Sequence, residues 1–202
     1  MPLTFDAEAL AETLATLSHA HRVAFCAAVC ERLVPNYVRF AREERWGNPT
    51  LLREALDIVW HCALGARSGS DELRVLAERS EEAAPEPAEF ESDLASAALD
   101  AANAVAASLR CCQDGDVERC IEVATYARDT VDMYVQIRES MDQDDPGLER
   151  RIADHPLMVR EMGKQSSDLE MLRRAPAVDD ALVRRLKGAG EGSLAESDAP
   201  RS

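Results

Sequence analysis

The chain has 202 residues and a mass of 22.2 kDa, which suits a single domain with a buried core. Hydrophobic residues make up 46% of it and aromatic residues 4%, so we expect a folded protein with a core of small and aliphatic side chains. The net charge of −15 argues against a protein that binds nucleic acid or an anionic membrane, because both need a basic surface.

The distribution of charge, the N-terminal sequence and the cysteines indicate where the protein is located and how its thiols are used. Residues 71–145 hold 20 acidic residues and 6 arginines, whereas residues 148–187 carry 9 basic and 7 acidic residues, a local charge of +2. No basic segment followed by an apolar run, as in a secretory signal, opens the sequence, so we expect a cytoplasmic protein. The six cysteines should then be reduced thiols that pack as small apolar core residues.

Helical periodicity begins close to the N-terminus. Asp6 can cap a first helix that runs to about Leu17, and Ser18 can cap the second helix. The apolar stripe of the second helix stays in phase across Pro35. Because proline removes one backbone hydrogen bond without forcing the helix to end, we expect a kink at Pro35 rather than a restarted helix.

The segment from Trp46 to Pro49 predicts the end of one helix and the start of the next. Gly47 can adopt the left-handed conformation that closes a helix. Asn48 can cap the third helix, and Pro49 fits its first position, where a missing N–H costs nothing. The third helix should then extend to Leu64.

Further helices are expected at residues 70–83, 94–109, 117–141, 156–174 and 178–187. Residues 81–93 form an acidic, proline-punctuated connector, and the alanine-rich helix at 94–109 is so apolar that it should be central. The pattern therefore predicts an all-α, single-domain bundle of seven or eight helices over residues 1–187. Residues 188–202 are small, polar and unpatterned, which predicts a disordered tail.

Two groups of polar residues are candidates for chemistry. Arg53, Asp57 and His61 recur every four residues on one helix, a spacing that could orient an imidazole or supply half of a metal site. The alternative interpretation is a charged stripe at the rim of the bundle. Asp100 lies on the apolar helix, where partial burial would raise its pKa and make it a general-acid candidate. Its alternative role is a structural network between helices.

Sequence motifs of catalysis or metal binding do not appear. There is no phosphate loop, dinucleotide fingerprint, nucleophile elbow or zinc-type ligand series. We therefore expect no catalytic residue, no bound cofactor and no metal site.

Several motifs resemble those of the YjaG-like family of bacterial proteins, a domain of unknown function. They are A-F…C-E-R-L-x-P-N-Y, G-N-P…L-R…A-L-D-x-V-W, A-L-D-A-A and D-H-P-L-M, within about residues 5–175. The resemblance implies an all-helical cytosolic protein without an assigned reaction or ligand. Of its motif positions, Asn36, Tyr37 and Arg53 have no structural explanation from the sequence and are candidates for a binding role.

These observations lead to two functional hypotheses. The preferred one is a non-enzymatic interaction or regulatory module that acts through a helical surface, with an unknown protein partner or by self-association, for example as a homodimer. The alternative is a small-ligand binder or enzyme with a polar pocket between the third and fifth helices. The candidate ligand or partner site comprises Asn36, Tyr37, Arg53, Asp57, His61 and Asp100.

Overall fold

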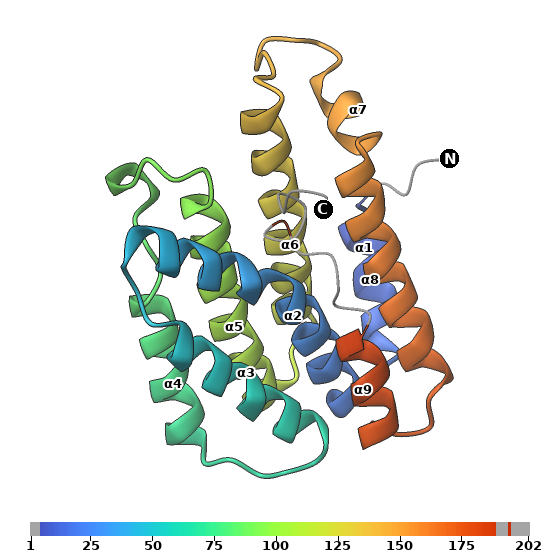
Figure 1. The fold of residues 1–202 in the computed structure, drawn as a ribbon. Coiled ribbons are helices and arrows are strands. Elements are labelled where there is room, and N and C mark those ends of the chain that lie inside the picture. The colour runs from blue at the N-terminus through green and yellow to red at the C-terminus, as the bar shows by residue number, and fades with distance from the viewer. Residues whose placement is uncertain (1–4, 189–193, 195–202) are drawn as a thin grey trace.

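The protein is all-α. The structure, a computed structural model, describes residues 5–188 and residue 194, and every regular element in that part is helical. The elements are α1 (Ala7–Ala15), α2 (His19–Glu44), α3 (Pro49–Ala63), α4 (Ser70–Glu82), the 3₁₀ turn η1 (Pro87–Glu89), α5 (Ala95–Asp114), α6 (Val117–Arg138), α7 (Leu148–Ala153), α8 (Pro156–Arg174) and α9 (Asp180–Gly188) (Figure 1).

Helix α5 is the centre of the bundle, as its alanine-rich sequence predicted. It packs against α2, α3, α4 and α6, and Figure 1 shows α2 crossing in front of it. Its alanines are all buried, and their small side chains let neighbouring backbones approach closely. No helix in the described ranges is long and apolar enough to cross a membrane.

Side-chain caps set the starts of several helices where the sequence predicted them. The Asp6 carboxylate accepts hydrogen bonds from two backbone N–H groups of α1, and the Ser18 hydroxyl caps α2. Asn48 Oδ1 accepts from the N–H of Leu51, with Pro49 at the first position of α3. Each cap satisfies backbone groups that the helix itself leaves without a partner.

Helix α2 continues through Pro35 over its full length of 26 residues, so the chain does not restart there. The left-handed residue that closes it is Arg45, with φ of 53°, and not Gly47 as predicted. Gly47 also has a positive φ, 86°, but it lies in the turn beyond the helix. The turn therefore needs two left-handed residues, and only the second is glycine.

The structure adds one helix that periodicity did not predict. The described part of the chain contains nine α-helices, whereas the pattern predicted seven or eight. The additional helix, α7, has six residues and buries only Ile152. A helix this short has too few apolar positions for its periodicity to be recognised. The predicted disordered tail stays a prediction, because apart from Gly188 and Leu194 it lies outside the described residues.

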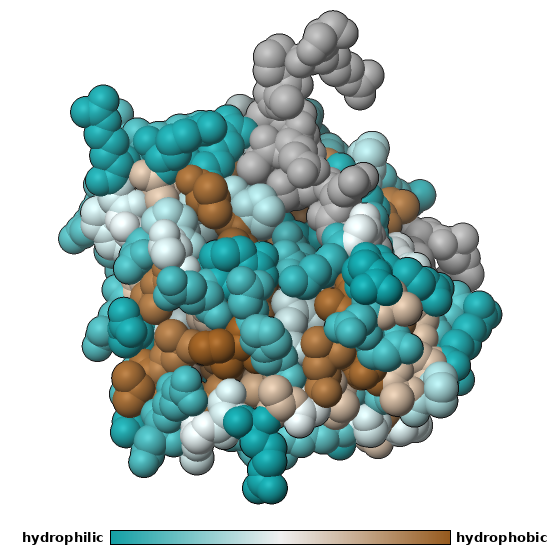
Figure 2. All heavy atoms as spheres, turned by 60° about the horizontal axis from the view of Figure 1, so that its bottom comes forward, coloured by the Kyte–Doolittle hydropathy of each residue, from teal (hydrophilic) through white to brown (hydrophobic). Residues whose placement is uncertain are grey.

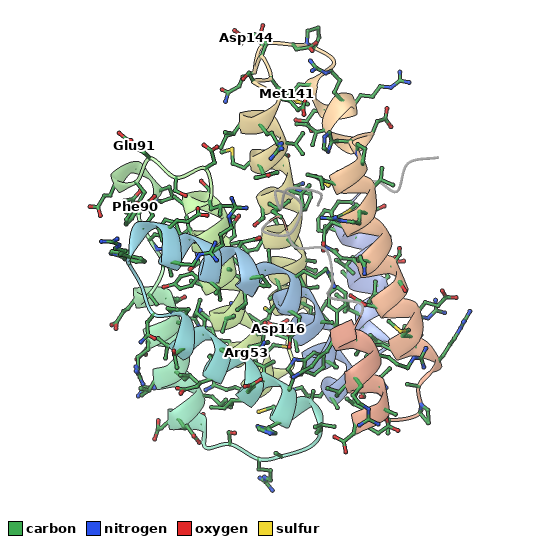
Figure 3. All side chains as sticks on the ribbon, viewed as in Figure 1. Arg53, Phe90, Glu91, Asp116, Met141 and Asp144 are labelled. Atoms are coloured by element: carbon green, nitrogen blue, oxygen red, sulfur yellow. The ribbon has the colours of Figure 1, made fainter. Side chains whose placement is uncertain are left out.

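An aromatic cluster joins the end of α2 to the connector before α5. The Phe40 ring lies edge-on to Phe90, with centroids 5.0 Å apart, and to Trp46 at 5.9 Å. Figure 3 labels Phe90 beside the C-terminal end of α2. Edge-to-face ring pairs add to the energy of apolar burial, so this cluster anchors the proline-rich connector to the bundle.

Candidate functional site

Glu31 of α2 is the centre of the polar cluster that contains Arg53. The Arg53 guanidinium donates two hydrogen bonds to the Glu31 carboxylate, at 2.8 and 3.1 Å, and a third to Asp57 at 2.7 Å. The indole N–H of Trp60 donates to the same Glu31 at 2.7 Å. Arg53 and Trp60 thus fasten α3 to α2, and Figure 3 shows Arg53 on α3.

Lys187 of α9 completes this Glu31 cluster. Its ammonium lies 3.6 Å from Glu31, 3.9 Å from Asp57 and 5.4 Å from the centroid of the Trp60 ring. Burial opposes ionisation of Glu31, but hydrogen bonds from Arg53 and Trp60 and the nearby positive charges outweigh it and lower its pKa. The cluster therefore holds a carboxylate that stays charged and joins three helices.

Tyr37 connects two helix ends in the corner that contains Gly47. Its buried hydroxyl donates to the carbonyl of Ala83 at 2.7 Å and accepts from the N–H of Asn48 at 3.1 Å. A Cβ atom on Gly47 would lie 2.5 Å from the Tyr37 oxygen. Tyr37 therefore has a structural role: it joins the end of α4 to the start of α3.

We predict that Tyr37→Phe lowers the free energy of unfolding by about 1–3 kcal/mol, because it leaves two backbone groups without a partner. Gly47→Ala should also destabilise, since alanine disfavours the positive φ and meets the Tyr37 hydroxyl. Urea unfolding followed by circular dichroism measures both variants and the double variant. The alanine penalty should shrink in the Tyr37→Phe background, and simple additivity would contradict the close contact.

Asp100 has a hydrogen-bond partner outside the Glu31 cluster. The Asp100 carboxylate accepts a hydrogen bond of 2.8 Å from the Thr130 hydroxyl of α6. Burial raises its pKa to about 6, although the Thr130 hydrogen bond opposes that rise. The His61 side chain is exposed on α3. The structure thus brings Arg53 and Asp57 together, but it holds Asp100 with a different partner.

A buried ionic network that we did not predict joins α2 to α8. Arg32 donates two hydrogen bonds to Glu161, at 2.9 and 3.0 Å, and one of 2.8 Å to Asp168. Arg32 also donates to the carbonyl of Ala28, and Gln165 donates to Glu161. All three charged side chains are buried, and Asp168 is completely inaccessible. Its second oxygen, Oδ1, accepts no hydrogen bond.

The sequence contains a signal for this network. Glu161, Gln165 and Asp168 recur at helical spacing on the same buried face of α8 as Met158 and Met162. Polar residues within an apolar stripe must find partners, since an unpaired buried charge is costly. The identity of the partner could not be read, because Arg32 is 129 residues from Glu161 in the chain.

The Asn36 side chain shares a small pocket with Arg32 and Glu161 of this network. Asn36 is 1% exposed and lines a space of about 20 Å³ together with Arg32, Glu161 and Leu194. That volume holds about one water molecule. The space that Asn36 lines is therefore too small for a metabolite.

A larger apolar groove, of about 590 Å³, lies among α6, α7 and α8, and we call it the α6–α8 groove. Its apolar lining consists of Phe5, Ile152, Ala153, Met158 and Met162, and its charged rim of Arg128, Asp132, Glu149, Arg150 and Asp154. Methionine side chains are flexible and polarisable, so they adapt to varied apolar partners. None of the six candidate residues lines this groove.

Comparison with known protein families shows to which family the chain belongs. The model of a family described as "Protein of unknown function (DUF416)" matches residues 9–192. The chain belongs to the DUF416 family. Its relatives include the uncharacterized protein YjaG of Escherichia coli K12 and that of Salmonella typhimurium LT2. Each is 25% identical over 186 residues, which cover 90% of this chain and 92% of the relative.

A solved structure extends this DUF416 relationship to the fold. The crystal structure of a DUF416 family protein from Shewanella baltica OS155 is similar with a TM-score of 0.78 and 27% identity. The match covers 89% of this chain and 92% of that one. The resemblance to the YjaG-like family inferred from the motifs is therefore confirmed.

The motif residues of this DUF416 protein hold helices together. Within C-E-R-L-x-P-N-Y, the Glu31 carboxylate binds α3 and Arg32 binds α8, while Tyr37 joins two helix ends. Within L-R…A-L-D-x-V-W, Arg53 and Trp60 both bind Glu31. These contacts supply the structural explanation that the sequence alone lacked for Tyr37 and Arg53.

Proposed function

We propose that this DUF416 protein is a non-enzymatic cytoplasmic interaction module that acts through the α6–α8 groove. The observation that carries the proposal is an apolar groove of about 590 Å³ bounded by charged side chains. Apolar surface with a polar rim is typical of protein interaction sites. The partner to which we commit is a second copy of the chain.

Charge supports this choice of partner. The chain as a whole carries −15, so most pairs of faces on two copies repel each other. The rim of the groove instead has both signs, with Arg128 and Arg150 beside Asp132, Glu149 and Asp154. A two-fold symmetric contact pairs one patch with itself, and a rim of mixed sign can satisfy that requirement. The Arg150 side chain is 89% exposed and accessible to such a partner.

The polar candidates favour an interaction module over an enzyme with a pocket between α3 and α5. Arg53 and Asp57 are engaged with Glu31 and Lys187, and Asp100 is engaged with Thr130 on another helix. A catalytic pocket needs groups that converge on one substrate-sized space. These groups instead bind separate partners on neighbouring helices.

Sedimentation velocity over a range of protein concentrations tests the proposal. We expect a concentration-dependent dimer for the natural chain. Ala153→Arg places a long cationic side chain in the groove on a helix that tolerates arginine, so it should shift the chain to monomer. Val75→Arg is the matched control, because Val75 is 44% exposed on α4 and remote from the groove lining.

Two outcomes would contradict the proposal. A chain that is monomeric at every concentration would exclude the second copy as the partner, and equal behaviour of the two arginine variants would exclude the groove as the interface. A photo-crosslinking residue at position 153 separates these cases further. If the residue at position 153 crosslinks to another protein and one at position 75 does not, the groove is an interface but its partner is not a second copy of the chain.

A further inference from the structure

Three cysteines that are far apart in the sequence meet at one end of the bundle. They are Cys26 of α2, Cys111 of α5 and Cys120 of α6, and all three are completely buried. Their sulfur atoms lie within 4.8 Å of one another, and those of Cys111 and Cys120 are 3.7 Å apart. We call this group the three-thiol cluster.

The sulfur separations suit a single shared cation. Metal–sulfur bonds of about 2.3 Å, at tetrahedral or trigonal angles, place two sulfur ligands about 3.8 to 4.0 Å apart. The 3.7 Å separation of the Cys111 and Cys120 sulfurs is close to that value. The Cys26 sulfur lies within 4.8 Å of both, so it needs to move by less than the length of one metal–sulfur bond. Three ligands from three helices that pack directly on one another also form a rigid frame.

We propose that the three-thiol cluster binds a thiophilic cation, with Cu(I) as the preferred ion. Thiolate sulfur is a soft ligand, and soft ligands select Cu(I) over the harder divalent cations. Structural zinc is bound by four ligands. Over residues 5–188, however, no fourth cysteine, histidine or carboxylate joins the three sulfurs. Binding exchanges thiol protons for the cation, and the released protons go to solvent.

A second pair of cysteines lies near the three-thiol cluster. Cys62 and Cys112 line a cavity of about 490 Å³ together with His19 and Val23. Cys112 follows Cys111 directly in α5, and Nε2 of His19 lies 2.9 Å from the carbonyl oxygen of Cys111. This cavity lies at the end of the bundle that Figure 2 turns toward the viewer, where apolar patches alternate with hydrophilic side chains. Interaction with the Cys112 thiol lowers the pKa of Cys62 to about 6.

Anaerobic titration of the full chain with Cu(I), in competition with the chromophoric chelator bicinchoninate, tests the proposal. We expect one tightly bound equivalent. Cys111→Ser and Cys120→Ser should each weaken binding by more than about 100-fold, because removal of a ligand exceeds the usual 10–100-fold effect of an outer-shell change. X-ray absorption of the loaded natural chain should give three sulfur ligands and no nitrogen or oxygen ligand.

Cys30→Ser is the matched control, because Cys30 is equally buried on α2 and bonds to Ser108 outside the cluster. It should bind Cu(I) as the natural chain does, and circular dichroism checks that each variant folds. Failure of the natural chain to compete with the chelator would overturn the proposal. Binding that is lost in Cys62→Ser but kept in Cys111→Ser and Cys120→Ser would also overturn it. An X-ray absorption spectrum that indicates fewer than three sulfur ligands would do the same. Tighter binding of Zn(II) through the same cysteines would overturn the choice of Cu(I).

Discussion

Arg32→Met should lower the free energy of unfolding by about 3–5 kcal/mol, the usual cost of breaking a buried ion pair by removing one partner. The substitution leaves Glu161 and Asp168 buried without their counter-charge. Asp168 is completely inaccessible and one of its oxygens already lacks a hydrogen bond, so solvent cannot replace the guanidinium. Urea unfolding at pH 7, followed by circular dichroism, measures the loss.

Arg74→Met is the control for this prediction. Arg74 pairs with Glu78 on the surface of α4, where both side chains are about half exposed, so its loss should cost less than about 0.5 kcal/mol. Adding Glu161→Gln and Asp168→Asn to Arg32→Met removes all three charges and should recover part of the stability. Equal costs for Arg32→Met and Arg74→Met would mean that the network between α2 and α8 contributes no stability.

Asp100→Asn should stabilise the protein at pH 7 by up to about 3 kcal/mol. The pKa of Asp100 rises from 3.8 to about 6 on folding, chiefly because of burial, so the folded state prefers the neutral carboxylic acid. One pKa unit corresponds to about 1.4 kcal/mol. Asparagine is neutral, has nearly the same shape and keeps an oxygen that can accept the Thr130 hydrogen bond.

The pH dependence gives a stricter test of this prediction. The pKa of Asp100 is higher in the folded state than in the unfolded state. Its contribution to the free energy of unfolding is therefore fully present below pH 3.8 and is lost as the pH rises through about 6. The difference in unfolding free energy between Asp100→Asn and the natural chain should therefore grow from pH 4 to pH 6 and level off above pH 7. Thermal and urea unfolding across that range measure it. A difference that is independent of pH would show that Asp100 titrates alike in both states.

The helices of this protein were largely predictable because their signals are local. Asp6, Ser18 and Asn48 cap the helices at the predicted positions, and the unbroken apolar phase across Pro35 correctly excluded a restarted helix. Two of the differences from the structure are also local in origin. A six-residue helix, α7, is shorter than two turns of the pattern, and the end of α2 uses Arg45 in a conformation that normally favours glycine.

The candidate site was predictable only within one helix. The four-residue spacing correctly placed Arg53 next to Asp57, but their main partner, Glu31, comes from α2. Consecutive residues on a helix point about 100° apart, so Glu31 faces α3 while Arg32 faces α8. Which of them meets which neighbour depends on how the helices pack.

Sequence alone was sufficient for the all-α class, the central alanine-rich helix and the family, because periodicity, caps and motifs depend on residues close in the chain. The network of Arg32 with Glu161 and Asp168, the three-thiol cluster and the α6–α8 groove became visible only in three dimensions. Each joins residues from different helices. Their contacts depend on the positions and rotations of whole helices, which arise from packing of the entire core and not from any local spacing.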